Sequence, residues 1–322
     1  MPRFNVLITD YAWPNVEIER QTLAEADAKL IVADRTDAAA LADLAAKHQV
    51  DAIMTNWAKV PQSVIEASSK CQIVSRLGIG LDNIDVAYCT GAGIPVTNVP
   101  DYCVIEVAEH ALALLLAMSR KVAFYHRETK SGLYQLQAGP KLRRIAGQTL
   151  GIVGLGNIGR KLVEKTAGLG LKVLATTRSR KDSPPGVTFC SLDELLANSD
   201  YVSLHTPLTP QTKHMLAAPQ FAAMKPTAYL INTARGGLID HAALQQALDA
   251  GQLAGAALDV QDPEPPDLSR PPYNDPRVIV TPHAAFVSEE SLNNLRTRTA
   301  RQVATRLTGG VPENVVNPAV LK

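Results

Sequence analysis

The sequence carries almost no excess of either charge. Its 322 residues include 32 basic and 31 acidic side chains, which gives a formal net charge of +1. Proteins that bind nucleic acid or an anionic membrane surface usually carry a basic excess, because phosphate groups must be neutralised. The balance therefore gives no reason to expect nucleic acid or a membrane as a partner.

Long apolar runs and a secretory leader are also missing. The longest apolar stretch extends only from Ala111 to Met118, far short of the roughly 20 residues that span a bilayer. The first ten residues, MPRFNVLITD, enter a strand-like run at once and lack the layout of a signal peptide. We therefore expect a cytoplasmic protein.

Cysteine motifs are absent as well. The four cysteines lie far apart and form neither a CxxC pair nor a Cys/His cluster at metal-ligand spacing. We expect them to be small buried apolar residues in a reducing compartment, and we predict no metal site.

Short β-branched runs alternate with helix-like stretches along the whole chain. This βαβα rhythm begins near Asn5 and starts again at Thr149, which predicts an α/β fold of two doubly wound parallel-sheet domains. Length and an ordinary globular composition agree with two domains. Between the two rhythms we expect one long helix, about Cys103 to His126, followed by a surface loop over Lys130 to Ile145.

A glycine-rich turn, GLGNIG, stands directly after one expected strand and before an expected helix. Gly154 permits the tight turn, Gly156 lets the backbone approach a pyrophosphate, and Gly159 lets the helix pack on the strand. The alternative is a purely structural turn, but the strand and helix around it favour dinucleotide binding. The residues expected to line the cofactor here are Val153, Gly154, Leu155, Gly156, Asn157, Ile158 and Gly159.

The next expected strand ends without the acidic residue that an NAD site places about 20 residues after its glycines. Thr177, Arg178 and Ser179 stand there instead. Hydroxyl and guanidinium groups can accept a 2′-phosphate, which a carboxylate would repel. We predict a preference for NADP(H), with NAD(H) as the second candidate; alternatively, these residues form a solvated basic loop.

Three segments at the ends of expected strands carry candidate catalytic groups. Arg235, in NTARGG, can pair with a carboxylate and polarise a neighbouring carbonyl. Glu264, in DPEPP, and His283, in TPHAA, form the pair that acid–base chemistry needs, because a carboxylate fixes the tautomer of a histidine and favours its imidazolium. Taken singly, each is more often a structural or solvated residue. Together beside a nucleotide loop, they indicate protonation of a carbonyl oxygen as hydride reaches its carbon.

On these motifs the chain resembles the D-isomer-specific 2-hydroxyacid dehydrogenase family over essentially its full length. The matching stretches are RLGIGLDNID (76–85), NVPDYCVIEVAEHALALLL (98–116), GLGNIG (154–159), NTARGGLID (232–240), ALDVQDPEP (257–265) and TPHAA (281–285). Within the family it is similar to C-terminal-binding proteins and, through Thr176-Thr177-Arg178, to glyoxylate and hydroxypyruvate reductases. It departs from the C-terminal-binding proteins in lacking their acidic residue at Thr177.

The resemblance implies a dehydrogenase that reduces 2-keto acids to D-2-hydroxy acids with NAD(P)H. It makes Arg235 the substrate-binding arginine, Glu264 the partner acid and His283 the proton donor. It assigns the nicotinamide carboxamide to Asp259. Further cofactor-binding residues that it implies are Thr206, Pro207, Thr212, Thr233, Ala234, His283 and Ala285.

The resemblance also assigns residues to the substrate. The loop of Arg76, Leu77 and Gly78 would hold the substrate carboxylate, although an interdomain salt bridge is the alternative role of Arg76. Phe286 would face the substrate, at a position where C-terminal-binding proteins have an aromatic residue. Trp57 is a further candidate near the substrate and could equally belong to the core.

The family organisation implies a discontinuous, flavodoxin-like substrate domain of residues 1–98 and 287–322, and a Rossmann nucleotide domain of residues 99–286. It implies a homodimer through the apolar helix around Ala108 to Met118, for which packing within one chain is the alternative. A nucleotide-sensing protein that recruits partners, like the corepressors, is the alternative function, and phosphite oxidation is a third. The complete set of Arg235, Glu264 and His283 argues against a pure scaffold. The motifs do not identify the side chain of the keto acid.

Overall fold

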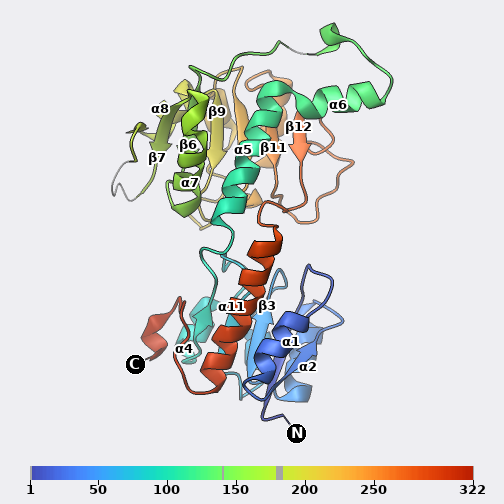
Figure 1. The fold of residues 1–322 in the computed structure, drawn as a ribbon, viewed down its shortest axis with the longest axis vertical. Helices are drawn as coiled ribbons and strands as arrows, with labels where there is room; N and C mark the ends of the chain where they lie inside the picture. The colour runs from blue at the N-terminus through green and yellow to red at the C-terminus, as the bar shows by residue number, and fades with distance from the viewer. Residues whose placement is uncertain (1, 140, 179–183, 322) are drawn as a thin grey trace. The chain divides into compact units, whose positions relative to one another are not determined.

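The computed structural model describes residues 2–139, 141–178 and 184–321. The chain forms two compact units, Met1–Tyr102 with Ser288–Lys322, and Cys103–Val287. Each unit contains one parallel sheet with helices packed on both faces (Figure 1). The predicted α/β class with two parallel sheets is therefore confirmed.

The first unit is built on a five-stranded sheet in the order β2-β1-β3-β4-β5, in which every neighbouring pair is parallel. This is the doubly wound order of flavodoxin-like sheets. The strands are β1 (Phe4–Ile8), β2 (Ala28–Val32), β3 (Ala52–Thr55), β4 (Ile73–Arg76) and β5 (Val96–Thr97). The strands in the middle of the sheet are buried along their whole length, which explains their β-branched and apolar composition.

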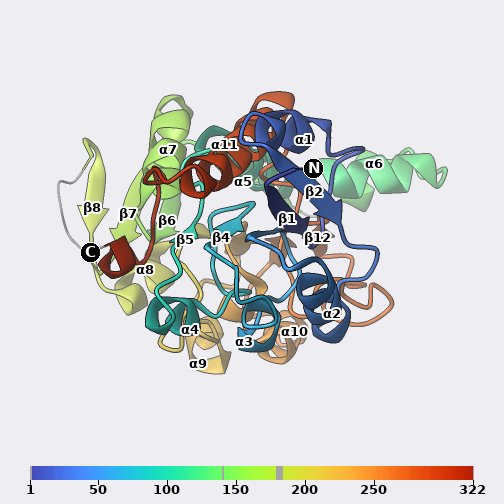
Figure 2. The same cartoon turned by 90° about the horizontal axis from the view of Figure 1, so that it is seen from below.

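Helices cover both faces of this first sheet. Figure 2 shows α1 and α11 side by side on one face, with α2, α3 and α4 on the other. The helices are α1 (Glu17–Ala24), α2 (Ala38–His48), α3 (Gln62–Ile65), α4 (Val86–Gly91) and α11 (Glu289–Leu307), with a short 3-10 helix, η4 (Pro318–Leu321), after them. Side-chain caps fix several of their starts: Asp37 accepts from Ala40 N at 3.1 Å, and Ser288 accepts from Ser291 N at 2.9 Å.

A buried ion pair fastens α11 to α1. Arg296 donates from Nε and Nη2 to the two carboxylate oxygens of Glu19 at 2.8 and 2.7 Å. The Glu19 side chain is fully buried and that of Arg296 is 8% exposed. The guanidinium also lies over the Trp13 ring, 5.2 Å from its centroid. A charge pair so deeply buried holds the two helices in one relative position, because neither charge can be left alone in this environment.

The second unit is built on a seven-stranded parallel sheet in the order β12-β11-β10-β9-β6-β7-β8. The order reverses at β6, as in Rossmann sheets, so that the carboxyl ends of β6 and β9 flank the switch point where ligands bind in such sheets. The strands are β6 (Thr149–Val153), β7 (Lys172–Thr176), β8 (Val187–Phe189), β9 (Tyr201–Leu204), β10 (Tyr229–Asn232), β11 (Gly255–Leu258) and β12 (Val278–Val280).

Two apolar cores lie on opposite faces of this second sheet. One includes Leu115 of α5 and Leu162 of α7, and the other includes Leu195 of α8, Phe221 of α9 and Leu244 of α10. The helices are α5 (Val104–Arg120), α6 (Val122–Lys130), α7 (Asn157–Thr166), α8 (Leu192–Asn198), α9 (Ala218–Ala222) and α10 (His241–Asp249). Three short 3-10 helices complete the unit: η1 (Leu136–Ala138), η2 (Ala167–Leu169) and η3 (Gly236–Leu238).

The single long helix expected over Cys103 to His126 is wrong. The structure has two helices there, because Lys121 adopts a left-handed conformation with φ of 55° that ends α5 and begins α6. Apolar periodicity cannot reveal such a break, since neither glycine nor proline stands at the position. The result is a second helix, α6, that extends away from the end of α5 (Figure 1) and has no buried residue.

Two expectations from composition can be compared with the structure. Among the described residues, no helix combines the length and the apolar character that a membrane crossing requires. Cys71, Cys89 and Cys103 are buried and Cys190 is partly buried, and none of the four forms a disulfide.

Candidate active site

The three candidate catalytic residues follow three neighbouring strands of the second unit. Arg235 comes three residues after β10, Glu264 lies in the loop after β11, and His283 comes three residues after β12. These strands are adjacent and parallel, so their carboxyl ends meet at one edge of the sheet. The fold thus gathers side chains that lie up to 48 residues apart in sequence, the separation of Arg235 from His283.

His283 and Glu264 are in direct contact. The distance from His283 Nδ1 to Glu264 Oε2 is 2.8 Å, and the other carboxylate oxygen accepts from Gln261 N at 2.8 Å. Their side chains are 24% and 31% exposed, so the pair is sheltered while the histidine keeps access to solvent. With Nδ1 facing the carboxylate, Nε2 is the ring atom available to exchange a proton with a ligand.

Glu264 is held in its ionised form. Burial alone would raise the pKa of its carboxyl, but hydrogen bonds from His283 and from the Gln261 backbone, with the charges of His283 and Arg235, bring that pKa below its ordinary value. The pair therefore has the geometry that a proton donor beside a fixed negative partner would need.

A tight turn presents Arg235. The buried Asn232 side chain donates to Arg235 O at 2.8 Å and accepts from Ala234 N at 3.0 Å, which closes the turn directly after β10. Gly236 then packs against the Gln261 backbone so closely that a Cβ atom would lie 2.1 Å from its carbonyl. Only glycine fits at this approach, which brings the turn of Arg235 against the loop of Glu264.

Asp259 organises the loop that carries His283. Its side chain is fully buried; Oδ1 accepts from Thr281 Oγ1 at 2.5 Å and from Ala284 N at 2.9 Å, and Oδ2 accepts from Ala285 N at 2.9 Å. Its backbone carbonyl also accepts from His283 N at 2.7 Å. His283 itself has φ of 54°, in the left-handed region that histidine adopts infrequently. These bonds are what hold it there.

The glycine turn lies between β6 and α7, at the switch point of the sheet. Gly154 has φ of 98°, and a Cβ atom there would lie 2.6 Å from His205 O, so this turn requires glycine. Gly156 differs: a Cβ atom there would meet nothing within 4 Å. It is also the N-cap of α7, and among the described residues no side-chain hydrogen bond caps the start of this helix. An uncapped helix start is the kind of place where a protein can bind an anion.

Other expected cofactor-binding residues surround this turn. Thr206 Oγ1 donates to Val153 O at 3.1 Å, and Thr212 Oγ1 donates to Pro207 O at 2.7 Å, which closes the loop after β9. Thr233 is buried, and its Oγ1 has no hydrogen-bond partner among the described residues. A buried hydroxyl without a partner is unfavourable by itself, which fits a ligand that completes the site.

The expected 2′-phosphate selectors follow β7, next to the glycine turn. Gly154 N donates to Thr176 O at 2.9 Å, so the end of β7 lies beside the turn. Thr177 is partly exposed and Arg178 is exposed at this position. Ser179 lies outside the described residues.

The expected substrate-binding segment lies in the first unit, at the end of β4, whose last residue is Arg76. Arg76 and Leu77 are buried. The Arg76 guanidinium donates to Asn56 Oδ1 at 3.2 Å and to the carbonyl of Leu77, and a Cβ atom on Gly78 would lie 2.8 Å from its Nη1. Leu77 N donates to Thr55 O at 2.8 Å. The arginine thus has several partners within its own unit.

Phe286, the other expected substrate-binding residue, contacts His283. The two rings meet edge to face, with centroids 6.0 Å apart, and the phenyl group is 8% exposed. In this position it packs against the candidate acid and limits the directions that the imidazole can take. Trp57, by contrast, is 44% exposed and is not a core residue.

Several residues of the site escaped sequence reasoning. Gln261 donates from Nε2 to Leu258 O and to Thr281 O, both at 3.1 Å, and so ties the loop after β11 to the strand end before His283. Asn232 and Thr281 act through hydrogen bonds described above. In the sequence, these three residues are marked only as polar residues at or near the ends of strands. They stand in the same motifs as the charged candidates.

Comparison with known proteins gives a consistent result. The family model for the D-isomer specific 2-hydroxyacid dehydrogenase NAD binding domain matches residues 112–285, more than half of the chain. A glyoxylate reductase of Korarchaeum cryptofilum is 38% identical over 271 residues, which are 82% of this chain and 81% of that protein. The chain spans about half the length of the D-3-phosphoglycerate dehydrogenases that it also matches.

Solved structures agree with the fold. A D-lactate dehydrogenase of Aquifex aeolicus, complexed with NAD and lactic acid, has a TM-score of 0.85 at 26% identity. An acyclic imino acid reductase, Bsp5, complexed with NADPH and D-Arg, gives the same two values, and in both cases 97% of this chain and 99% of the other are covered. These relatives are enzymes, and nothing in them favours the corepressor-like alternative. The chain belongs to the D-isomer-specific 2-hydroxyacid dehydrogenase family.

Proposed function

We propose that this dehydrogenase reduces a small 2-keto acid to the D-2-hydroxy acid with NADPH. The observation that carries the proposal is the 2.8 Å contact between His283 Nδ1 and Glu264 Oε2 at the sheet edge where Arg235 also stands. In this proposal His283 donates the proton, Glu264 keeps it charged, and Arg235 binds the substrate. Glyoxylate and hydroxypyruvate are the first substrates to test, since several relatives carry those names.

The chemistry assigned to each side chain follows from its geometry. A bound nicotinamide cofactor would supply the hydride. His283, charged beside Glu264, would give its Nε2 proton to the substrate oxygen, and the carboxylate would stabilise the positive ring before transfer and fix its tautomer. Arg235 would pair with the substrate carboxylate and polarise the neighbouring carbonyl through its planar fork. Asp259 stays a predicted partner of the nicotinamide carboxamide. Its carboxylate accepts two hydrogen bonds on Oδ1 and one on Oδ2, so one lone pair of Oδ2 is left for a ligand.

The residues present fit a dinucleotide. The uncapped start of α7, the open space at Gly156 and the partnerless hydroxyl of Thr233 all favour a phosphate-containing ligand. For the choice of cofactor, Thr177 and Arg178 support NADPH, because neither repels a 2′-phosphate. NAD(H) is the alternative, and similar structures hold one cofactor or the other.

The first unit supplies the remaining assignments. We propose that residues 1–98 and 287–322 form the substrate domain and residues 99–286 the nucleotide domain, and that Arg76, Leu77 and Gly78 bind the substrate carboxylate. The resemblance supports these roles. The Arg76→Met substitution should then raise the KM for the keto acid far more than the Kd for NADPH.

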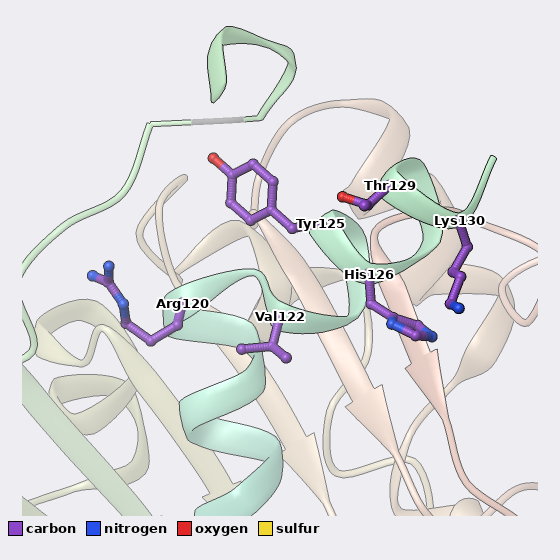
Figure 3. A pocket seen from close by; sticks show the side chains of 6 residues that line it. All are labelled: Arg120, Val122, Tyr125, His126, Thr129 and Lys130. Carbon is purple, nitrogen blue, oxygen red and sulfur yellow. The ribbon is translucent and has the colours of Figure 1, made fainter. Parts of the chain in front are cut away.

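We also propose a cytoplasmic homodimer. The expected interface, the helix around Ala108 to Met118, packs largely within this chain, since Ala108, Ala111 and Leu115 are buried in the core. The support is instead the apolar surface that α6 and the segment after it expose: Val122 is 58%, Tyr134 90% and Leu136 83% exposed. A groove of about 390 Å³ runs along α6 (Figure 3), and the side chains that line it are Arg120, Val122, Tyr125, His126, Thr129 and Lys130. Light scattering after gel filtration should give twice the chain mass of 34.5 kDa, and Tyr134→Ser with Leu136→Ser should give the single mass.

The test of function is a panel of 2-keto acids assayed with NADPH and with NADH. The proposal predicts oxidation of NADPH with at least one of them, a D-hydroxy acid as product, and tighter binding of NADPH than of NADH. Thr177→Asp should reverse that preference. Equal or tighter NADH binding by the natural chain would overturn the cofactor assignment, and no turnover with any keto acid would overturn the function.

A further inference from the structure

A chain of hydrogen bonds connects helix α5 to the loop of His283. His110, on α5, places Nε2 3.1 Å from Thr281 Oγ1, and Thr281 Oγ1 lies 2.5 Å from Asp259 Oδ1. His110 Nε2 is also 3.4 Å from the same carboxylate oxygen. All of these residues belong to the second unit.

The burial of Asp259 makes these hydrogen bonds important for the loop of His283. The Asp259 side chain has no exposed surface, so water cannot replace any bond that it loses. Its side chain and backbone together hold the Thr281 hydroxyl and the backbone N–H groups of His283, Ala284 and Ala285. A change in the orientation of this carboxylate would therefore be passed directly to the loop that fixes His283 in its left-handed conformation.

The hydrogen bonds from His110 to Asp259 all run in the same direction, from donor to acceptor. The shorter contact uses the hydroxyl hydrogen of Thr281, which donates to Asp259 Oδ1; both oxygens of this carboxylate act as acceptors, since they also accept from Ala284 N and Ala285 N. The Thr281 oxygen is then left to accept, and His110 Nε2 must carry the hydrogen that it receives. His110 therefore orients the hydroxyl, the hydroxyl orients Asp259, and Asp259 holds the loop.

We propose that His110 is a positioning residue for the reduction, acting on His283 through Thr281 and Asp259. The proposal rests on the function proposed above, in which His283 is the proton donor. Among the contacts described, His110 touches neither His283 nor Glu264, so its effect on their chemistry would pass through Thr281 and Asp259.

Two matched substitutions separate the hydrogen bond from simple packing. His110→Phe keeps a ring of similar size on α5 but has no N–H group, whereas His110→Gln keeps a donor with a similar reach. Thr281→Val removes the middle hydroxyl with little change in shape. Each protein should first be shown to melt within a few degrees of the natural chain.

Turnover gives the first readout. Losing one hydrogen bond in the chain should lower kcat about tenfold in His110→Phe and in Thr281→Val, while the KM for the keto acid changes less than threefold. His110→Gln should recover most of kcat. The double variant should be no slower than either single one, because both remove the same chain. An unchanged kcat in His110→Phe, no recovery by glutamine, or multiplied losses in the double variant would overturn the proposal.

A second readout needs no turnover. Nitrogen-15 NMR of the histidine side chains, with the His110 signal assigned through its absence in His110→Gln, should show a hydrogen on Nε2 of His110, and Thr281→Val should shift that signal. An Nε2 without hydrogen would overturn the proposal even if the enzyme is active. An inactive natural chain that shows the expected Nε2–H would count against the proposed function and leave the hydrogen-bond chain standing.

Discussion

Gly156 offers a way to separate the requirements of the fold from those of the ligand. A Cβ atom at this position would meet nothing within 4 Å, and its φ of −81° is ordinary for alanine. The fold therefore has no need of glycine here, but a methyl group would stand where a pyrophosphate would approach the start of α7. Gly156→Ala should leave the protein folded and impair cofactor binding.

The size of the effect follows from the bonds at stake. Charge-assisted hydrogen bonds are worth about 1.5–3 kcal/mol each, so displacing the phosphate from one N–H group should weaken the cofactor Kd by about 10–100-fold. The melting temperature should stay within about 2 °C, since no contact of the protein is lost. Fluorescence titration with NADPH and thermal melting of the ligand-free protein measure the two quantities separately.

Two control glycines complete the design. At Gly159 a Cβ atom would lie 2.4 Å from Gly154 O, so Gly159→Ala should be destabilising by about 1–3 kcal/mol through overpacking. At Gly168 the added atom meets nothing within 4 Å, and Gly168→Ala should change neither quantity. If Gly156→Ala bound NADPH within threefold of the natural chain, the idea that this turn approaches the phosphates would be refuted.

Three further predictions concern the partner acid, a partly buried histidine and the buried ion pair. Glu264→Gln should lower kcat about 10–100-fold at an unchanged melting temperature, since it removes the charge beside His283; a kcat within twofold of the natural value would contradict this role. Burial lowers the pKa of His205 to about 4. As the pH falls, the unfolded chain therefore binds a proton on this histidine near pH 6.5, whereas the folded chain binds it only near pH 4. Urea melts should therefore show stability falling between these values, by at most about 3 kcal/mol, and His205→Gln should flatten that slope. Glu19→Gln should be destabilising by about 3–5 kcal/mol, because it leaves the buried Arg296 without an opposite charge. The control Glu17→Gln, on the exposed side of the same helix, should change stability by less than about 0.5 kcal/mol.

The placement of the candidate residues of the second unit could be predicted from the sequence for a physical reason. Parallel strands end at one edge of a sheet, so charged side chains that directly follow successive strands must come together. Arg235, Glu264 and His283 all satisfy that condition, and no knowledge of distant packing was needed to place them at one sheet edge. The glycine turn was predictable in the same way, because strand and helix flank it in the sequence.

Other features depend on contacts that a local pattern cannot contain. The break at Lys121 has no glycine or proline to mark it, and β5 has only two residues, too few for a periodic signal. The link from His110 to Thr281 joins residues 171 positions apart. Such a contact is fixed by the packing of α5 against β11, which emerges only from the complete fold.

The rate of hydride transfer in a single turnover tests the central claim most directly. Enzyme loaded with NADPH would be mixed with its best keto acid, and the natural chain compared with His283→Ala after equal cofactor binding has been verified. Loss of the proton donor should slow transfer by about 10²–10⁴-fold. Transfer at the natural rate in His283→Ala would show that this histidine is not the acid, and the proposed mechanism would be wrong.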